Sequence, residues 1–136
     1  LNFYAENLVY TKEKVKEIVK SKGKLLLMSY HDFEKTPSEQ EIQNLIDRCK
    51  LEGADIVKYA FKANSFEDVA KVMCITNKNK DKNIVAISMG DIGKITWVAG
   101  FMFGSLITYT YIGESFAPGQ IEARKLIQMI EFFKGG

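Results

Sequence analysis

Four short apolar runs, each followed by a stretch with helical periodicity, constrain the fold of this chain more than any other feature. The runs are rich in Val, Ile, Leu and aromatic residues and lack the strict alternation of a half-exposed strand, which is typical of parallel strands buried on both faces. Because a parallel strand needs a crossover, usually a helix, to reach the next one, this order of segments predicts an α/β fold with a parallel sheet. The predicted strands cover residues 24–33, 55–61, 83–90 and 106–114.

Helices are expected before, between and after these strands. Thr11 can cap an amphipathic helix at 11–22, which would stop at Gly23. The stretch 36–39 reads Thr-Pro-Ser-Glu, a capping box with proline at the first helical position, and Ser65 can cap the next helix. The last two predicted helices lie at 95–104, where apolar residues occur on nearly all sides and predict burial, and at 121–133.

Length, composition and charge limit the classes of function. With 136 residues and 46% hydrophobic content, the chain is expected to form one domain over residues 1–136. Its 19 basic and 17 acidic residues are interleaved, so nucleic acid is not an expected partner. No apolar run reaches the length of a membrane span and no signal peptide is recognisable, which favours a cytoplasmic protein without membrane contact. Cys49 and Cys74 are expected to be reduced packing residues, because neither has a Cys or His partner nearby.

Four βα units can form either a small open sheet or half of a (βα)₈ barrel. In such a barrel the functional groups lie at the C-terminal ends of the strands. His31, Lys58, Met89 and Gln120 all fall near or just beyond the predicted strand ends. The barrel therefore predicts that four separate segments converge on one mouth.

Lys58 stands in GADIVKYAF, a run that is otherwise apolar after its aspartate. A buried ammonium must be paired, neutralised or used chemically, although a lysine on the solvent face of a strand explains this position alone equally well. His31 is the only histidine of the chain and follows a buried strand. Taken alone, it fits a structural hydrogen bond at a strand end at least as well as catalysis.

Considered together, Lys58 and His31 favour a catalytic interpretation over a structural one. Adjacent parallel strands lie about 4.8 Å apart, so Lys58 and His31 could meet over one small cavity. A desolvated lysine has a lowered pKa and can form an imine with a ketone, and a nearby imidazole can move protons at neutral pH. The pair predicts Schiff-base chemistry on a small-molecule carbonyl substrate.

Several motifs resemble one protein family in the right order. SYHDF with the following TPS, GADIVK, ISMG, the GxxxGS of residues 100–105 and APGQI look like type I 3-dehydroquinate dehydratase, from about Lys24 to Phe133. The resemblance implies the C-terminal half of a TIM (βα)₈ barrel. It also implies a lyase of the shikimate pathway, which removes water from 3-dehydroquinate on the way to the aromatic amino acids. No metal or dissociable cofactor is implied, because the covalent imine itself acts as the electron sink.

The resemblance also implies roles for individual residues. Lys58 would form the imine with the substrate ketone. His31 would be the general acid and base that removes the C2 proton and assists loss of the hydroxyl. Met89 would line the pocket, and Gln120 would hydrogen-bond the substrate. Ser115 is a further candidate contact, displaced by one position from the family's serine.

The surroundings of the histidine match the family only in part. Ser29 and Asp32 flank His31, and each either fixes the orientation of the imidazole or satisfies a strand end. Ser29 is also a candidate contact to the substrate. The family's acidic partner of the histidine belongs to the strand before the first one recognisable here, and no Asp or Glu of this chain matches it.

The carboxylate side of the site departs further from the family. Thr96-Trp97 stands where the family has Ser-Arg, and the indole of tryptophan cannot make the bidentate pair of that arginine with a carboxylate. Phe116 replaces the serine of the family's SAPGQ turn. Two alternatives to the dehydratase follow: a non-catalytic half-barrel that serves as a pseudoenzyme or assembly subunit, and a Schiff-base lyase for a smaller, uncharged carbonyl compound.

Half of a closed barrel cannot be covered on all sides by itself. Four parallel strands taken from a barrel leave two unpaired edges and one exposed apolar face. The expected partner is therefore a second copy of the chain or the N-terminal half of the barrel, and the chain is expected to form an oligomer.

Overall fold

The computed structural model describes residues 12–115 and 119–135. Within them no helix is long and apolar enough to cross a membrane. In chain order the elements are α1 (Lys12–Ser21), β1 (Leu27–Asp32), α2 (Glu39–Leu51), β2 (Ile56–Lys62), α3 (Phe66–Lys78), β3 (Ile84–Met89), α4 (Lys94–Ala99) and α5 (Ala123–Phe133), with 3₁₀ turns at Lys80–Lys82, Asp91–Gly93 and Gly100–Phe103.

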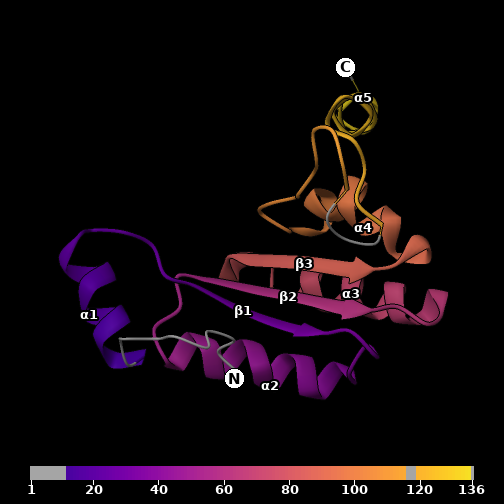
Figure 1. The fold of residues 1–136 in the computed structure, drawn as a ribbon. Coiled ribbons are helices and arrows are strands. Elements are labelled where there is room, and N and C mark those ends of the chain that lie inside the picture. The colour runs from indigo at the N-terminus through magenta and orange to yellow at the C-terminus, as the bar shows by residue number, and fades with distance from the viewer. Residues whose placement is uncertain (1–11, 116–118, 136) are drawn as a thin grey trace.

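The three strands form one parallel sheet in the order β1-β2-β3 (Figure 1). Ser29 pairs with Lys58, and Lys58 pairs with Val85, so the strands are in register at the level of the lysine. Because the crossovers α2 and α3 connect parallel neighbours, the predicted α/β architecture is confirmed for these units.

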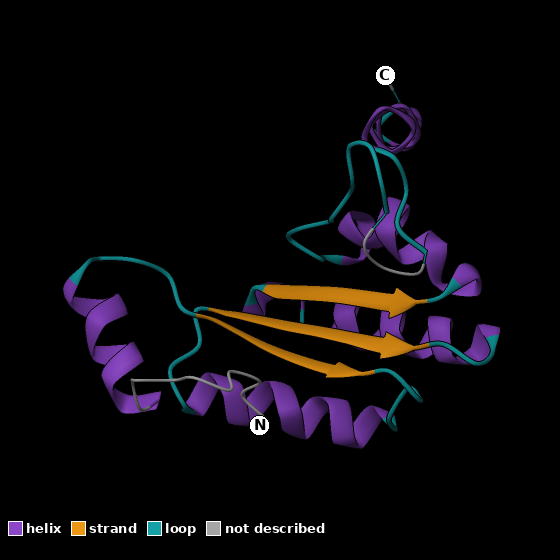
Figure 2. Cartoon of the chain, viewed as in Figure 1, coloured by secondary structure: helices purple, strands orange, loops and turns teal. Residues whose placement is uncertain are grey.

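Helices α2 and α3 cover one face of the sheet, which we call the outer face (Figure 2). Their apolar residues, Ile42 and Ile46 on α2 and Val72 on α3, pack against Tyr59 and Phe61 of β2 in one cluster. All five side chains are completely buried. The large apolar area removed from water makes this layer the main core of the chain.

The opposite face, which we call the inner face, is covered unevenly. Over β2 and β3, Ala60 and Met89 pack with Trp97 of α4 and with Tyr109, and all but Tyr109 are buried. Over β1, His31 is exposed, as are Leu27 and Ser29. The inner face is therefore sealed on the β3 side and open on the β1 side.

The helix starts confirm one predicted cap and correct another. Ser65 caps α3 by accepting a hydrogen bond from the Asp68 N–H, as expected. For α2 the cap is Ser38, which forms the capping box with Glu41, so Pro37 precedes the cap and is not the first helical residue. Thr36 was expected to start this helix but instead donates its hydroxyl hydrogen to the carbonyl of Lys62 at 2.9 Å.

The first helix ends where expected. Gly23 follows α1 with a φ of 60°, the left-handed conformation that favours glycine after a helix. Thr11, its predicted cap, lies outside the described residues. Contact between Lys12 and Glu52 ties α1 to the C-terminal end of α2.

The predicted fourth strand at 106–114 does not join the sheet as a strand. Only Ser105 and Leu106 engage β3, through a single bridge to Ile84. Beyond them, hydroxyl groups replace the main-chain ladder: Thr108 donates to the Trp97 carbonyl at 2.7 Å, and Thr110 donates to the Ile121 carbonyl at 2.6 Å. Tyr111 makes one further isolated bridge, to Glu122, so the segment forms no continuous ladder and no strand despite its β-type composition.

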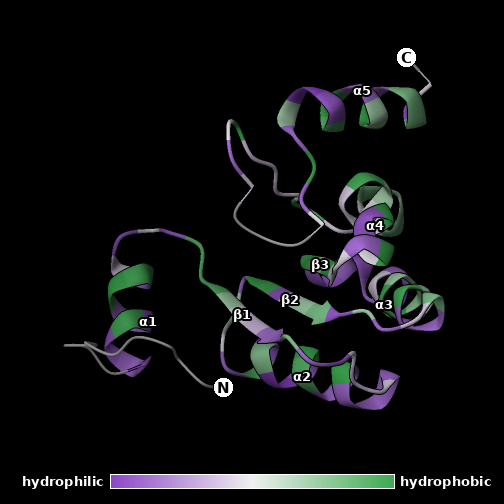
Figure 3. Cartoon of the chain, turned by 45° about the vertical axis from the view of Figure 1, so that its right-hand side comes forward, coloured by the Kyte–Doolittle hydropathy of each residue, from purple (hydrophilic) through white to green (hydrophobic). Residues whose placement is uncertain are grey.

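The predicted buried helix at 95–104 is shorter than expected. Helix α4 ends at Ala99, and the 3₁₀ turn that follows leaves Phe101, Met102 and Phe103 exposed. Helix α5 forms at its predicted place, but it stands apart from the sheet and keeps several hydrophobic side chains in solvent (Figure 3).

The cysteines are both free thiols, as expected, but they differ in environment. Cys49 is buried in the main core, whereas Cys74 is exposed. The prediction that both are packing residues is therefore wrong for Cys74, which lies on the solvent side of α3.

Candidate active site

Lys58 lies on the inner face, but not at the end of its strand. It is the third of the seven residues of β2, whereas the sequence placed it at the strand's C-terminal end. Its side chain is half-buried, and Nζ lies over the ring of Tyr109, 4.3 Å from the ring centroid. Desolvation lowers the pKa of Lys58 below the usual lysine range. The neutral amine is therefore more accessible than in a solvated lysine.

His31 is the last residue but one of β1 and points from the same face. The Nε2 atom lies 3.4 Å from the Ser29 hydroxyl oxygen, and the ring stacks on Phe33 with centroids 6.0 Å apart. Partial desolvation, and secondly the positive charge of Lys58, lower the pKa of His31. The lysine and the histidine are thus close enough for their charges to interact, and neutral imidazole is favoured near pH 7.

Of the two residues that flank the histidine, Ser29 contacts the ring and Asp32 does not. The Oδ1 atom of Asp32 accepts the backbone N–H groups of Glu34 and Lys35, at 2.9 and 3.0 Å. Asp32 therefore satisfies the strand end. Among the described residues, no carboxylate is hydrogen-bonded to His31, in agreement with the missing acidic match.

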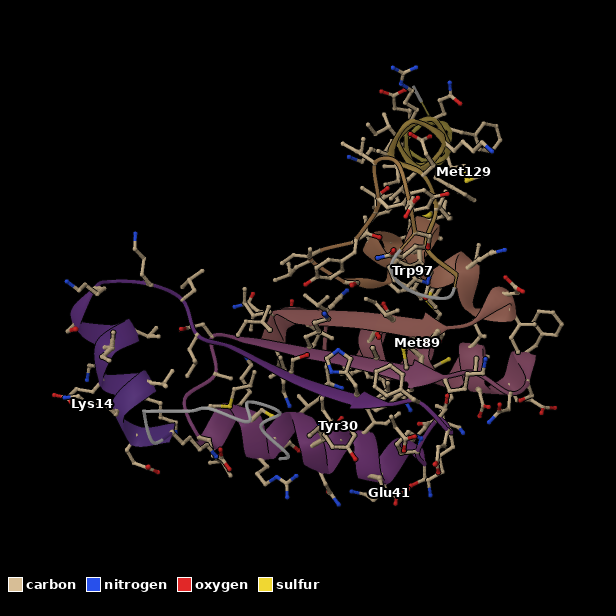
Figure 4. The ribbon with its side chains drawn as sticks, in the orientation of Figure 1. Lys14, Tyr30, Glu41, Met89, Trp97 and Met129 are labelled. Atoms are coloured by element: carbon tan, nitrogen blue, oxygen red, sulfur yellow. The ribbon has the colours of Figure 1, made fainter. Side chains whose placement is uncertain are left out.

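Met89 and Trp97 fill the β3 side of the inner face. Met89 is buried against Ala60, Ile87 and Trp97, and Figure 4 shows Trp97 close to it at the side of β3 that faces α4. The indole Nε1–H donates to the Ser88 carbonyl at 3.3 Å. Trp97 is thus a packed core residue, and its only polar hydrogen is occupied.

Gln120 and Ser115 lie in the connection between α4 and α5. Gln120 is half-buried and lines a cavity of about 540 Å³ between α4 and α5, whose described lining contains neither Lys58 nor His31. Ser115 is exposed, directly before residues 116–118, which lie outside the description and include Phe116. The structure therefore brings together Lys58, His31 and Ser29, whereas Met89 lies further along the inner face, where it pairs with Lys62.

Two residues of this region were missed by sequence reasoning. Tyr109 belongs to the segment that was expected to be a strand, and its aromatic ring was interpreted only as β-propensity. Lys62 lies four residues after Lys58 on the same strand, so period-two alternation places both on the inner face. That spacing could have identified Lys62 from the sequence.

The site contains an amine of lowered pKa, Lys58, and an imidazole that can carry a proton, His31. The described residues include no group of three or more His, Cys, Asp or Glu placed to hold a metal ion. What the groups present can do is add a lysine nitrogen to a carbonyl carbon and move a proton next to it.

Comparisons with known proteins identify the family of this chain. A family model described as type I 3-dehydroquinase matches residues 6–136. A 3-dehydroquinate dehydratase of Aquifex aeolicus is 43% identical over 120 residues, which are 88% of this chain and 54% of that protein.

Two solved 3-dehydroquinate dehydratases share the fold. The enzyme of Geobacillus kaustophilus superposes with a TM-score of 0.85 at 28% identity, over 89% of this chain and 48% of the other. That of Clostridium difficile gives a TM-score of 0.84 at 29% identity, over 90% and 50% of the two chains. The chain spans about half the length of the relatives it matches, which are TIM barrels. The chain belongs to the type I 3-dehydroquinase family.

Proposed function

We propose that this chain carries the Schiff-base centre of a 3-dehydroquinate dehydratase. The observation that carries the proposal is a half-buried lysine with a lowered pKa, Lys58, beside an imidazole, His31, whose pKa responds to the lysine's charge. One group can act as nucleophile and the other as proton carrier on the same substrate.

The reaction divides between the two residues. The neutral Lys58 amine adds to the substrate ketone, and loss of water from the adduct leaves an iminium ion. The iminium withdraws electrons from the neighbouring carbon, so His31 takes the C2 proton and an enamine forms. As the enamine returns its electron pair, the C1–O bond breaks, and the imidazolium gives its proton to the hydroxyl, which leaves as water. Hydrolysis of the imine then releases 3-dehydroshikimate and Lys58.

The relatives support a covalent mechanism. The solved Clostridium difficile enzyme contains covalently modified comenic acid. The imine supplies the electron sink, so this route uses no dissociable cofactor. In this proposal Ser29 orients His31, and Met89 lines the pocket. Gln120 and Ser115 remain proposed substrate contacts.

We infer that a second half-barrel completes the site. The described elements form one half-barrel unit in this proposal, with α1 as its first helix. The inner face leaves both Leu27 and His31 of β1 exposed, and β1 has no described neighbour on its outer edge. An unpaired edge and an open apolar face favour association, with a second copy of the chain or with the N-terminal half of a barrel.

One observation favours a second candidate. Trp97 is buried in the position where the family resemblance places an arginine for the substrate carboxylate. A Schiff-base lyase for a smaller, uncharged carbonyl compound needs no such arginine. The non-catalytic half-barrel is the remaining alternative. A panel of ketones and aldehydes with borohydride trapping separates these readings, because a non-catalytic half-barrel forms an oligomer but traps none of them.

The test of the main proposal is borohydride reduction in the presence of 3-dehydroquinate. Intact-mass and peptide analysis should find the reduced substrate on Lys58, in the chain alone or after addition of the N-terminal half of the Aquifex aeolicus relative. Lys58→Ala should abolish the adduct, whereas Lys22→Ala, at an exposed lysine after α1, should not. The absence of an adduct in both arms, or an adduct that survives Lys58→Ala, rejects the proposal.

A further inference from the structure

We propose that Lys62 binds the carboxylate of the substrate while Lys58 holds its ketone; this inference rests on the proposed function and extends it to a residue at the mouth of the site. Lys62 is the last residue of β2 and pairs with Met89. It lies on the same face as Lys58, with about 13 Å between their Cα positions at the usual rise of a strand. This separation leaves room for one small ring between the two side chains.

The ammonium of Lys62 lies across the end of β3. A Cβ atom on Gly90 would stand 2.9 Å from Lys62 Nζ, and Gly90 has a φ of 94°. A side chain at this position would therefore displace the ammonium. Gly119 approaches the same place from the other side, because a Cβ on it would be 2.7 Å from the Gly90 carbonyl oxygen. Lys62 thus stands where the end of β3 meets the turn that contains Gln120.

The charge of Lys62 is not neutralised by the described residues. None of their salt bridges includes it. The charge of Lys62 contributes to the lowered pKa of Asp91, but the Asp91 carboxylate is exposed and pairs with Lys94 at 2.8 Å. Lys62 is half-buried, so its charge is less screened than that of a fully solvated lysine. An inward cation without a close partner is suited to an anionic ligand.

The substrate's own chemistry fits this spacing. In 3-dehydroquinate the ketone and the carboxylate stand on ring carbons separated by one carbon. With the ketone carbon bonded to Lys58 Nζ, the carboxylate can point toward the C-terminal end of β2, where Lys62 lies. Trp97 cannot serve instead, because its indole N–H is already donated to the Ser88 carbonyl.

The first test measures the 3-dehydroquinate concentration that half-saturates borohydride trapping. Lys62→Met should raise it about tenfold, the lower end of what a charge-assisted hydrogen bond contributes. Lys62→Arg should recover most of the loss. Lys22→Met is the matched control and should have no effect. With the uncharged methyl ester as ligand, Lys62→Met and the unmodified chain should be equal. Equal half-saturation for the carboxylate in both proteins overturns the proposal.

The second test separates this inference from the proposed function. Quinate has an alcohol in place of the ketone and cannot form an imine. Titration with quinate should shift the side-chain nitrogen resonance of Lys62 in the NMR spectrum, and Lys62→Met should weaken quinate binding about tenfold. If no borohydride adduct forms, the proposed function fails and the quinate titration alone decides the role of Lys62. If quinate leaves the Lys62 resonance unmoved, the carboxylate role is rejected, whatever happens at Lys58.

Discussion

Replacing Trp97 by arginine should destabilise the chain rather than restore a carboxylate contact. The sequence alone suggests the opposite, because arginine is the residue that the family resemblance expects at this position. In the structure the indole is 4% exposed and packs against Ala60, Ile87 and Met89. A guanidinium placed there meets apolar side chains and, among the described residues of that cluster, no carboxylate.

The magnitude follows from burial. A tryptophan removes about 250 Å² from water, which at about 25 cal/mol per Å² is an upper value of about 6 kcal/mol. The stem of an arginine recovers part of this area, but the buried charge has a cost of its own. We expect the free energy of unfolding to fall by about 3–5 kcal/mol, a large part of the 5–15 kcal/mol typical of a domain.

Urea denaturation followed by far-UV circular dichroism measures this loss. Tryptophan fluorescence cannot be used for the variant, because Trp97 is the only tryptophan of the chain. Trp97→Phe is the matched control: it keeps an aromatic ring but removes the hydrogen bond to Ser88, and should lose only about 1–2 kcal/mol. A Trp97→Arg variant within about 1 kcal/mol of the unmodified chain would refute the assignment of this ring to the core.

Three further predictions concern packing and proton transfer. Gly93→Ala should lower the free energy of unfolding by about 3 kcal/mol, because the new Cβ would lie 2.2 Å from the Ser88 carbonyl oxygen; Gly100→Ala, with its nearest contact at 3.5 Å, should change the same urea midpoint little. Tyr109→Leu should lower the pKa of Lys58 further, because a cation–π contact of about 0.5–2 kcal/mol is lost while an apolar side chain still covers the lysine. NMR titration of the lysine measures this pKa, and Tyr109→Phe, which keeps the aromatic ring, is the control. An unchanged pKa in Tyr109→Leu contradicts the cation–π contact. Proton removal by neutral His31 should increase as the pH rises through its lowered pKa, so the acid limb of the dehydration rate should lie below the usual histidine range; a limb above that range contradicts the assignment.

Local patterns were sufficient for the parallel strands and the helices between them. Each of these elements is specified by its own residues: short runs that bury apolar side chains against the helices, and helices capped by Ser38 or Ser65. The exact start of α2 was wrong because Thr36, Pro37 and Ser38 offer two competing caps, and only tertiary contact with Lys62 decides between them. The segment at 106–114 was wrong because a strand needs a ladder partner, which composition cannot supply.

The site was predictable to the extent that it follows from strand alternation. Lys58 and His31 share a face because the register of β1 and β2 sets both by parity. The cover over Lys58 could not be predicted, since the position of Tyr109 depends on hydrogen bonds of Thr108 and Thr110 to distant carbonyls. Long-range packing also buries Trp97 against Ala60, Ile87 and Met89. The position of Trp97 in the sequence motif does not predict this burial.

The uneven cover of the inner face sets a route of entry. Tyr109 and Trp97 cover the β3 side, so the solvent-open part of the inner face is the β1 side, where His31 lies. A molecule that enters from this side would approach across the edge of the sheet. A second half-barrel seated on β1 would close that lateral path and leave only passage along the barrel axis, past Lys62 at the strand ends. Assembly would then change the order in which an incoming molecule meets the two lysines.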